Sequence, residues 1–161
     1  TCLYHELKRD ASPFWQCLRK KLKVSEDVHV NDVGYEVCML RDLAKAGHIA
    51  RDLHPNMLTK QTFDLVLTLS NDEVVLIEAK AHQGFSRRQI DNMKHTSELL
   101  LQSEKLGIRK VHLAGLHSSR YSPRHIRAEY PTMALITWLD LVSVYTDISA
   151  DLKRANDIFD D

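Results

Sequence analysis

The sequence predicts an α/β fold in which helices flank a central mixed β-sheet. Segments with helical apolar spacing alternate with short apolar runs of the strand type, in the order helix, helix, hairpin, helix, strand, basic segment, strand, helix. A hairpin supplies an antiparallel pair of strands, whereas a strand reached through a helix is typical of a parallel pair. The sheet should therefore contain both kinds of pairing.

Length and composition indicate one globular unit. The chain has 161 residues, of which 43% are hydrophobic, and no low-complexity tract divides it. This is enough apolar material to bury a core, so we expect residues 1–161 to form a single domain. Lys plus Arg and Asp plus Glu number 22 each. The net charge therefore does not indicate a polyanionic partner. Only the distribution of charge along the chain can indicate one.

The cysteines and the apolar runs indicate the setting of the protein. Cys2, Cys17 and Cys38 are widely spaced and form no Cys-x-x-Cys pair, which argues against a zinc knuckle and against a disulfide framework. We expect a reducing, intracellular setting, in the cytoplasm of a prokaryote. No apolar run approaches the roughly 18 residues of a membrane span, so we expect no membrane partner.

Two helices are predicted before the hairpin. The first should run from Pro13 to about Lys23, with Ser12 as its N-cap. Its basic residues 19–21 are expected to face solvent, and contact with a phosphate backbone is the alternative. The second helix is predicted over residues 32–46.

The hairpin is predicted from two strand-like runs. Residues 63–69 and 74–80 are rich in β-branched residues and leucine, and Ser-Asn-Asp between them is typical of a turn. If the strands pair symmetrically about Asn71, Asp64 lies opposite Glu78.

Three charged side chains should converge at the end of the second strand. Because side chains alternate along a strand, Lys80 shares a face with Glu78, and Asp64 lies across from both. The apolar run before Glu78 suits a strand buried on both faces, where charges are costly unless they are paired or bind a metal. We interpret the group as a metal and catalytic site, with a structural ion pair as the alternative. Mg²⁺, or Mn²⁺ in its place, should bind Asp64, Glu78 and the backbone carbonyl of Ala79.

Glu36 is a further candidate. On a helix over residues 32–46 it falls inside the apolar arc, where a glutamate is unusual. Two interpretations remain open. Its stem packs while its carboxylate reaches water or an arginine, or it is a third acid directed at the same site as Asp64 and Glu78.

The helix after the hairpin has a strong start signal. Ser86 and Gln89 have the form of a capping box, so the helix should begin at Ser86 and continue to about Lys105. Its first turn follows Lys80 by a few residues, which places Gln89 near the site. Gln89 is either the partner in the capping box or a member of the site.

Two more strands, over residues 110–116 and 133–138, are separated by a basic segment. No acid occurs between Lys105 and Ala128, and a basic patch in a neutral chain suggests a phosphate-binding edge, with a solvated loop and short helix as the alternative. Helices are predicted over residues 139–145 and 150–159. The arginines that we expect to contact nucleic acid are Arg87, Arg88, Arg120, Arg124 and Arg127.

In this layout, Phe63-Asp64 and Glu78-Ala79-Lys80 resemble the two elements of the PD-(D/E)xK nuclease superfamily, whose members have the restriction-endonuclease-like fold. The resemblance implies that Asp64 and Glu78 bind a divalent metal and that Lys80 assists the attacking water. It also implies that an acid on the first core helix, by position Glu36, completes the site.

Gln89 resembles the glutamine that the RecB-like and resolvase-like branches carry after the lysine. The RecB-like pattern has a tyrosine four residues later, where this chain has Met93.

We therefore expect an enzyme, a Mg²⁺-dependent deoxyribonuclease that hydrolyses phosphodiester bonds as an endonuclease, with DNA as its partner. The sequence leaves open a homodimer. The alternative is a catalytically inactive nuclease-like domain that serves as a nucleic-acid-binding or assembly module. A histidine-based enzyme is less favoured, because the nine histidines form no His-x-His or His-Glu-x-x-His pair.

Overall fold

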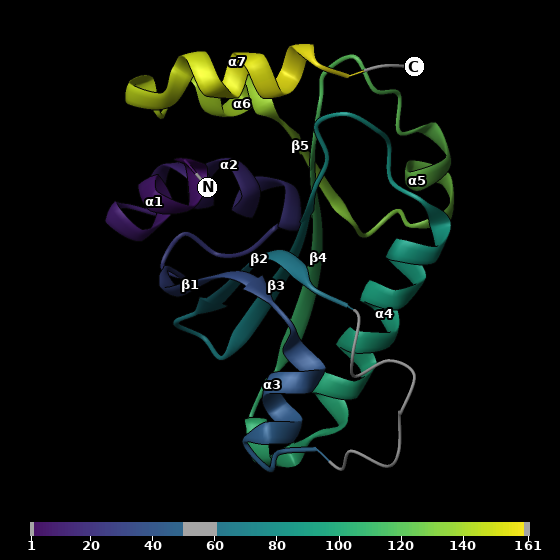
Figure 1. Cartoon of the computed structure of the whole chain (residues 1–161). Helices are drawn as coiled ribbons and strands as arrows, with labels where there is room; N and C mark the ends of the chain where they lie inside the picture. Colours follow the sequence, from purple (N-terminus) through teal and green to yellow (C-terminus); the bar gives the residue numbers. More distant parts are fainter. Residues whose placement is uncertain (1, 50–60, 160–161) are drawn as a thin grey trace.

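A five-stranded mixed sheet lies at the centre of the protein and has helices on both faces (Figure 1). The computed structural model describes residues 2–49 and 61–159. The strands lie in the sheet in chain order. The second strand is antiparallel to both of its neighbours, and the third, fourth and fifth strands are parallel. They are β1 (Val30–Val37), β2 (Phe63–Leu69), β3 (Glu73–Ala79), β4 (Lys110–His117) and β5 (Ala134–Thr137). The α/β prediction and the mixture of pairings are confirmed.

The predicted hairpin is present with the predicted register. Leu65 pairs with Ile77 and Thr68 pairs with Val74, so the two strands are symmetric about Asn71. β2 and β3 carry side chains that are buried on both faces of the sheet, because helices cover each face. The same register, continued by one pair, sets Asp64 opposite Glu78.

The helices divide between the two faces of the sheet (Figure 1). One face is covered by α1 (Cys2–Arg9), α2 (Ser12–Leu22), α6 (Trp138–Val142) and α7 (Ser149–Asp157). The other is covered by α3 (Met39–Lys45), α4 (Arg87–Gln102) and α5 (Arg124–Glu129). The described residues also form two short 3₁₀ helices, η2 (Glu104–Leu106) and η3 (Thr146–Ile148). Each face thus has its own apolar core, and α4 lies over the face to which Glu78 points.

α4 connects β3 to the parallel strand β4 and begins where the sequence predicts. Ser86 is its N-cap: the Ser86 hydroxyl accepts a hydrogen bond from the Gln89 N–H, and the Gln89 side chain accepts one from the Ser86 N–H, each at 3.2 Å. This is the expected capping box. The helix ends at Gln102, earlier than predicted, and η2 follows before Gly107 turns the chain at a positive φ.

The helix predicted over residues 32–46 is wrong in its first half, which forms β1, and only α3 is helical. Val30, Val33 and Val37 occur at a spacing that also suits a helix, but β-branched residues fit a pleated strand well. Hydrogen bonding to β2 decides the outcome, because the register of β1 against β2 runs along nearly the whole strand. The local spacing of apolar residues cannot predict pairing with a strand that is distant in the chain.

The N-terminal region differs in two further respects. α1 was not predicted, and it is held by burial of Leu3 and Leu7 against the sheet. Ser12 is not the N-cap of α2. That position is taken by Ala11, while the Asp10 carboxylate accepts a hydrogen bond from the Ser12 N–H at 2.9 Å.

The C-terminal elements match the prediction with shifted boundaries. The fourth predicted strand is β5, but Trp138 already belongs to α6, because Thr137 and Asp140 form a capping box at that point. α7 overlaps most of the predicted 150–159 segment, beginning one residue earlier and ending at Asp157. None of the described helices combines the length and the apolar character needed to cross a membrane.

Gly115 on β4 tests the packing between the sheet and the start of α4. It lies opposite Glu78, and an added Cβ would be 2.6 Å from Phe85 Cζ and 2.9 Å from Leu135 Cδ2. We expect Gly115→Ala to lower the free energy of unfolding by about 1–3 kcal/mol, the usual cost of overpacking. Urea denaturation followed by circular dichroism measures this change, and an unchanged value would contradict the packing described.

Candidate active site

Three of the predicted site residues, Glu78, Lys80 and Gln89, meet at the end of β3. Lys80 Nζ lies 2.7 Å from Glu78 Oε1, and Gln89 Nε2 donates a hydrogen bond to the same oxygen at 3.0 Å. The Glu78 and Lys80 side chains are only 12% and 13% exposed. The strand and the first turn of α4 therefore bring together three residues that the sequence selected.

Asp64 approaches the same point from the beginning of β2. Its Oδ2 accepts a hydrogen bond from the backbone N–H of Ala79 at 2.7 Å. Ala79 lies between Glu78 and Lys80, so Asp64 is tied to the middle of the Glu-Ala-Lys element. The predicted convergence of two carboxylates and one amine is present.

The electrostatics of the site centre on Glu78. Burial is the main cause that raises the pKa of the Glu78 carboxyl, and the charge of Asp64 raises it further. The hydrogen bond from Lys80 acts in the opposite direction, because it stabilises the carboxylate. A buried carboxyl with a raised pKa beside a second carboxylate is typical of catalytic and metal-binding sites.

The donor set suits a hard divalent cation that keeps several waters. Lys80 and Gln89 share one oxygen of Glu78, and Ala79 takes one oxygen of Asp64, so Glu78 Oε2 and Asp64 Oδ1 accept no hydrogen bond from described residues. Two carboxylate oxygens with a nearby carbonyl match the chemistry that Mg²⁺ prefers. Within residues 2–49 and 61–159, no group of three or more His, Cys, Asp or Glu side chains is placed to hold a metal ion.

Gln89 fulfils both roles that the sequence left open. Its side-chain oxygen accepts the hydrogen bond from the Ser86 N–H, while its Nε2 donates to Glu78. The capping box therefore holds the amide in position, with its donor directed at the carboxylate. The helix start and the site share one residue.

Glu36 does not join this group. It lies on β1 instead of a helix, is exposed, and has a positive φ of 50°. The register of β1 against β2 sets it level with Asp64, but its carboxylate interacts with the Tyr35 hydroxyl, which raises the pKa of Tyr35. The prediction that Glu36 lies on a helix and completes the site as a third acid is therefore corrected. The residue reaches the level of the site along a strand, and it completes no cluster of three acids.

Trp138 is a member of the surroundings that the sequence analysis missed. Its indole Nε1 donates to the backbone carbonyl of Lys80 at 2.9 Å, and the Lys80 N–H donates to the carbonyl of Leu116 at 2.7 Å. Both contacts fix the backbone just after β3. A partly buried indole N–H usually finds an acceptor, but the sequence does not say which one.

The arginines predicted to contact nucleic acid fall into two groups. Arg87 pairs with Glu129, and Arg120 donates to the backbone carbonyl of Asp157 at 3.0 Å, so both are engaged within the protein. Arg88, Arg124 and Arg127 are exposed and form no ion pair with any described residue. These three remain available to an external anion.

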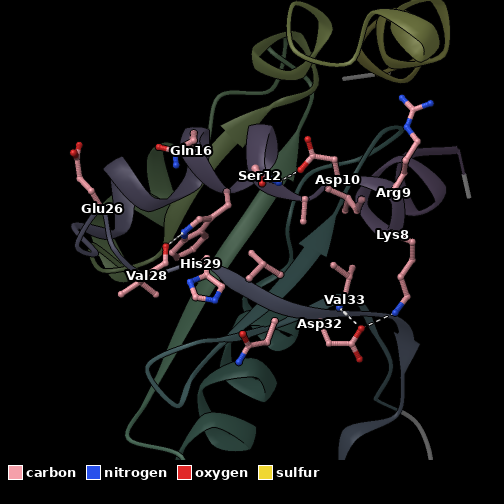
Figure 2. A pocket seen from close by; sticks show the side chains of 15 residues that line it. Lys8, Arg9, Asp10, Ser12, Gln16, Glu26, Val28, His29, Asp32 and Val33 are labelled. Carbon is pink, nitrogen blue, oxygen red and sulfur yellow. Dashed lines mark hydrogen bonds and ion pairs between the residues drawn. The ribbon is translucent and has the colours of Figure 1, made fainter.

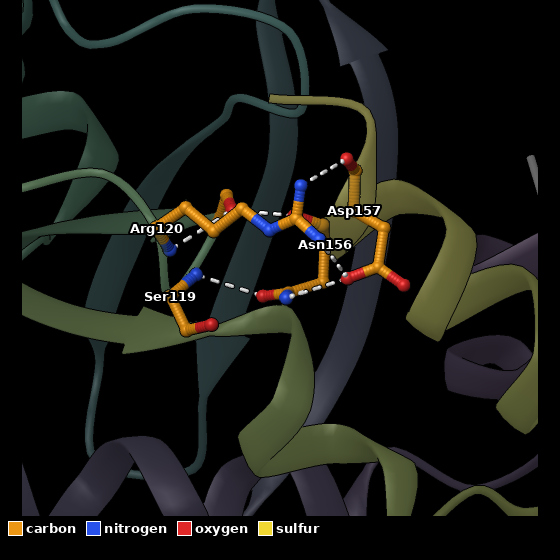
Figure 3. A network of polar contacts seen from close by, with 5 residues as sticks. Ser119, Arg120, Asn156 and Asp157 are labelled. Carbon is orange, nitrogen blue, oxygen red and sulfur yellow. Dashed lines mark hydrogen bonds and ion pairs between the residues drawn. The ribbon is translucent and has the colours of Figure 1, made fainter. Parts of the chain in front are cut away.

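The segment that carries Arg120 is anchored to α7 (Figure 3). The Ser119 N–H donates to the Asn156 side-chain oxygen at 2.7 Å, and the Ser118 hydroxyl donates to the Asn156 carbonyl at 2.5 Å. Asn156 is buried, with 2% of its surface exposed. The basic segment is therefore packed against α7 where it leaves β4, while Arg120, Arg124 and Arg127 are exposed. Its phosphate-binding role stays a prediction, with a solvated loop and short helix as the alternative.

A separate pocket lies between α1, the start of α2 and β1, and its volume is about 380 Å³ (Figure 2). Several of its charged groups have partners within the protein: Lys8 Nζ lies 2.6 Å from Asp32 Oδ1, and Asp10 accepts from the Ser12 N–H. His29 is the one histidine among the described residues that line it. This pocket offers no arrangement for histidine-based catalysis.

Comparison with protein-family models, with curated proteins and with solved structures gave no match to this chain.

The raised pKa of Glu78 has a measurable consequence for stability. Because the folded state holds the Glu78 proton more tightly than the unfolded state does, stability from this group is lost as pH rises from the ordinary value of 4.5 through the higher folded pKa. Glu78→Gln cannot ionise and lacks this loss. We expect the free energy of unfolding of Glu78→Gln minus that of the wild type to increase with pH above about 4.5 and then level off.

Urea titrations of metal-free protein over this pH range measure the difference. The matched control is Glu104→Gln, which removes an exposed acid on η2 that forms no ion pair with a described residue, and for which the difference should stay nearly constant. A flat profile for Glu78→Gln would contradict the electrostatics described.

Proposed function

We propose that this protein is a metal-dependent deoxyribonuclease of the PD-(D/E)xK superfamily, with a restriction-endonuclease-like fold, and that it hydrolyses DNA phosphodiester bonds as an endonuclease. One observation carries the proposal: Glu78 is buried at the end of a central strand, in contact with both Lys80 and Gln89, and Asp64 is bonded to the backbone between Glu78 and Lys80. The mixed sheet with helices on both faces supports it.

Asp64, Glu78 and the carbonyl of Ala79 are the groups that would hold Mg²⁺ or Mn²⁺. A divalent metal, when bound, supplies a water of lowered pKa and offsets charge on the scissile phosphate. The free oxygens on Asp64 and Glu78 are the ligands that the protein offers for it. Burial of Glu78 favours such a role, because a buried carboxylate is costly unless a cation accompanies it.

Lys80 is the residue that we assign to the reaction itself. Its ammonium group is held against Glu78, and its backbone is fixed on both sides by Leu116 and Trp138. In this position it can donate a hydrogen bond to the attacking water or to a phosphate oxygen, which stabilises charge that develops in the transition state. Gln89 acts as a positioning residue, since it holds the Glu78 carboxylate through Nε2.

The exposed arginines Arg88, Arg124 and Arg127 are the groups that we assign to the DNA backbone near the site. α4 and α5 adjoin one another: Arg87 pairs with Glu129, and Tyr130 donates a hydrogen bond to Asp91 at 2.7 Å. Positive side chains on these two elements therefore belong to one side of the protein, where they can contact phosphates without reading the sequence.

Metal binding is the first test. We expect Mg²⁺ or Mn²⁺ to bind the wild type in calorimetric titration and to bind Asp64→Asn at least about ten-fold more weakly, because a ligand oxygen is replaced by an amide group. Asp72→Asn is the matched control, since Asp72 is an exposed acid in the turn between β2 and β3. Equal affinity in the wild type and Asp64→Asn would overturn the metal assignment.

The catalytic role of Lys80 should be separable from metal binding. We expect Lys80→Ala to lower the rate of metal-dependent DNA cleavage by about 10² or more, while metal and DNA affinities stay nearly unchanged. Lys153→Ala on α7 is the control, and circular dichroism must show both variants folded. The rate is measured across a range of pH, because loss of Lys80 also removes the contact that lowers the pKa of Glu78.

Full metal-dependent activity of Lys80→Ala, in a preparation free of contaminating nuclease, would contradict the catalytic assignment. A nuclease-like domain that only binds nucleic acid or assists assembly would then be the favoured function.

A further inference from the structure

A second basic surface lies away from the active site. A groove of about 500 Å³ is bounded by the end of α2, one side of α4, and the segments that begin β4 and lead into β5. Four exposed lysines line it, and we call it the lysine groove: Lys21, Lys23, Lys94 and Lys110. The sequence analysis treated basic residues on the first helix as a solvated face, and the fold places Lys21 beside lysines from two other elements.

The positive charge of the lysine groove is not neutralised within the described part of the chain. None of its four lysines forms an ion pair with a described residue. Glu98 is the one acid among the described lining residues, and it lies 3.9 Å from His95 Nδ1. The nearby Glu73 is bonded to the buried His112 at 2.6 Å. Glu73 also attracts Lys110, but four lysines face only these two acids among the described residues, so a positive charge is left to attract an external anion.

The residue types indicate which anion fits. Lysine carries a compact ammonium group without the planar fork by which arginine grips a single phosphate or carboxylate. Four separate ammonium groups along an open groove suit a chain of phosphodiesters, whose backbone is bound by charge and without regard to base sequence. Arg19 does not add to this surface, because it is buried and bonded to Gln16 and Glu26.

The lysine groove is separate from the active site. In the backbone register of β3 against β4, Lys110 is opposite Glu73. Glu78 is five residues further along β3, which corresponds to roughly 17 Å along the strand. We infer that the lysine groove is a second binding region for the phosphodiester backbone of DNA, which engages nucleic acid at a distance from the residues that cleave it. The choice of DNA as the ligand rests on the proposed function.

The test measures DNA binding without metal, so that cleavage does not interfere. Lys23→Gln combined with Lys110→Gln removes two charges from the groove, and Lys45→Gln combined with Lys153→Gln removes two exposed lysines from α3 and α7. Fluorescence anisotropy with labelled duplex DNA in EDTA, at several salt concentrations, gives the affinity and its salt dependence. We expect the groove variant to bind all sequences more weakly and to reduce the slope of log K against log salt by about 1 for each lysine.

The control variant should keep the wild-type slope. An unchanged slope in the groove variant, equal losses of DNA affinity in the two variants, or no DNA binding by the wild type would each overturn the inference.

Cleavage assays distinguish the failure of this inference from the failure of the proposed function. A wild type that does not cleave DNA but binds it through the groove lysines supports the groove and refutes the nuclease. A wild type that cleaves DNA without needing these lysines refutes the groove alone.

Discussion

The burial of Glu78 is the constraint on which the rest of the site depends. Its carboxyl group lies at the end of a strand whose preceding residues are enclosed by two apolar cores, where an uncompensated charge would be costly. Lys80 and Gln89 compensate it through one oxygen, and the second oxygen is left for another partner. Removing either compensating residue would leave the Glu78 carboxylate with a single donor, so the strand end, the helix start and the lysine are mutually dependent.

The topology of the sheet explains why these groups meet. The hairpin sets Asp64 level with Glu78, and the parallel crossover from β3 to β4 requires a helix that starts beside the end of β3. Gln89 lies in the first turn of that helix and is oriented by the capping box. The site is therefore built on regular elements and their termini, an arrangement that holds side chains more precisely than loops do.

Basic residues are distributed over two regions of a chain whose net charge is zero. Arg88, Arg124 and Arg127 lie on α4 and α5, which begin near the candidate site, while the lysine groove lies toward the opposite ends of β4 and β5. Pairing within the fold separates available charges from engaged ones: Arg87, Arg120 and Arg19 all have acidic partners. Counting charges along the sequence cannot make this distinction, because the partners are distant in the chain.

The sequence by itself determined the hairpin, its symmetry about Asn71, the start of α4 at Ser86 and the convergence of Asp64, Glu78 and Lys80. These features depend on short-range chemistry, since turn residues, alternation and capping act within a few residues. Only the tertiary structure decided that residues 30–37 form a strand, that Glu36 stays outside the acidic pair, and that Trp138 fixes the backbone after Lys80. In each of these cases the partner lies far away in the chain, and a local pattern carries no information about it.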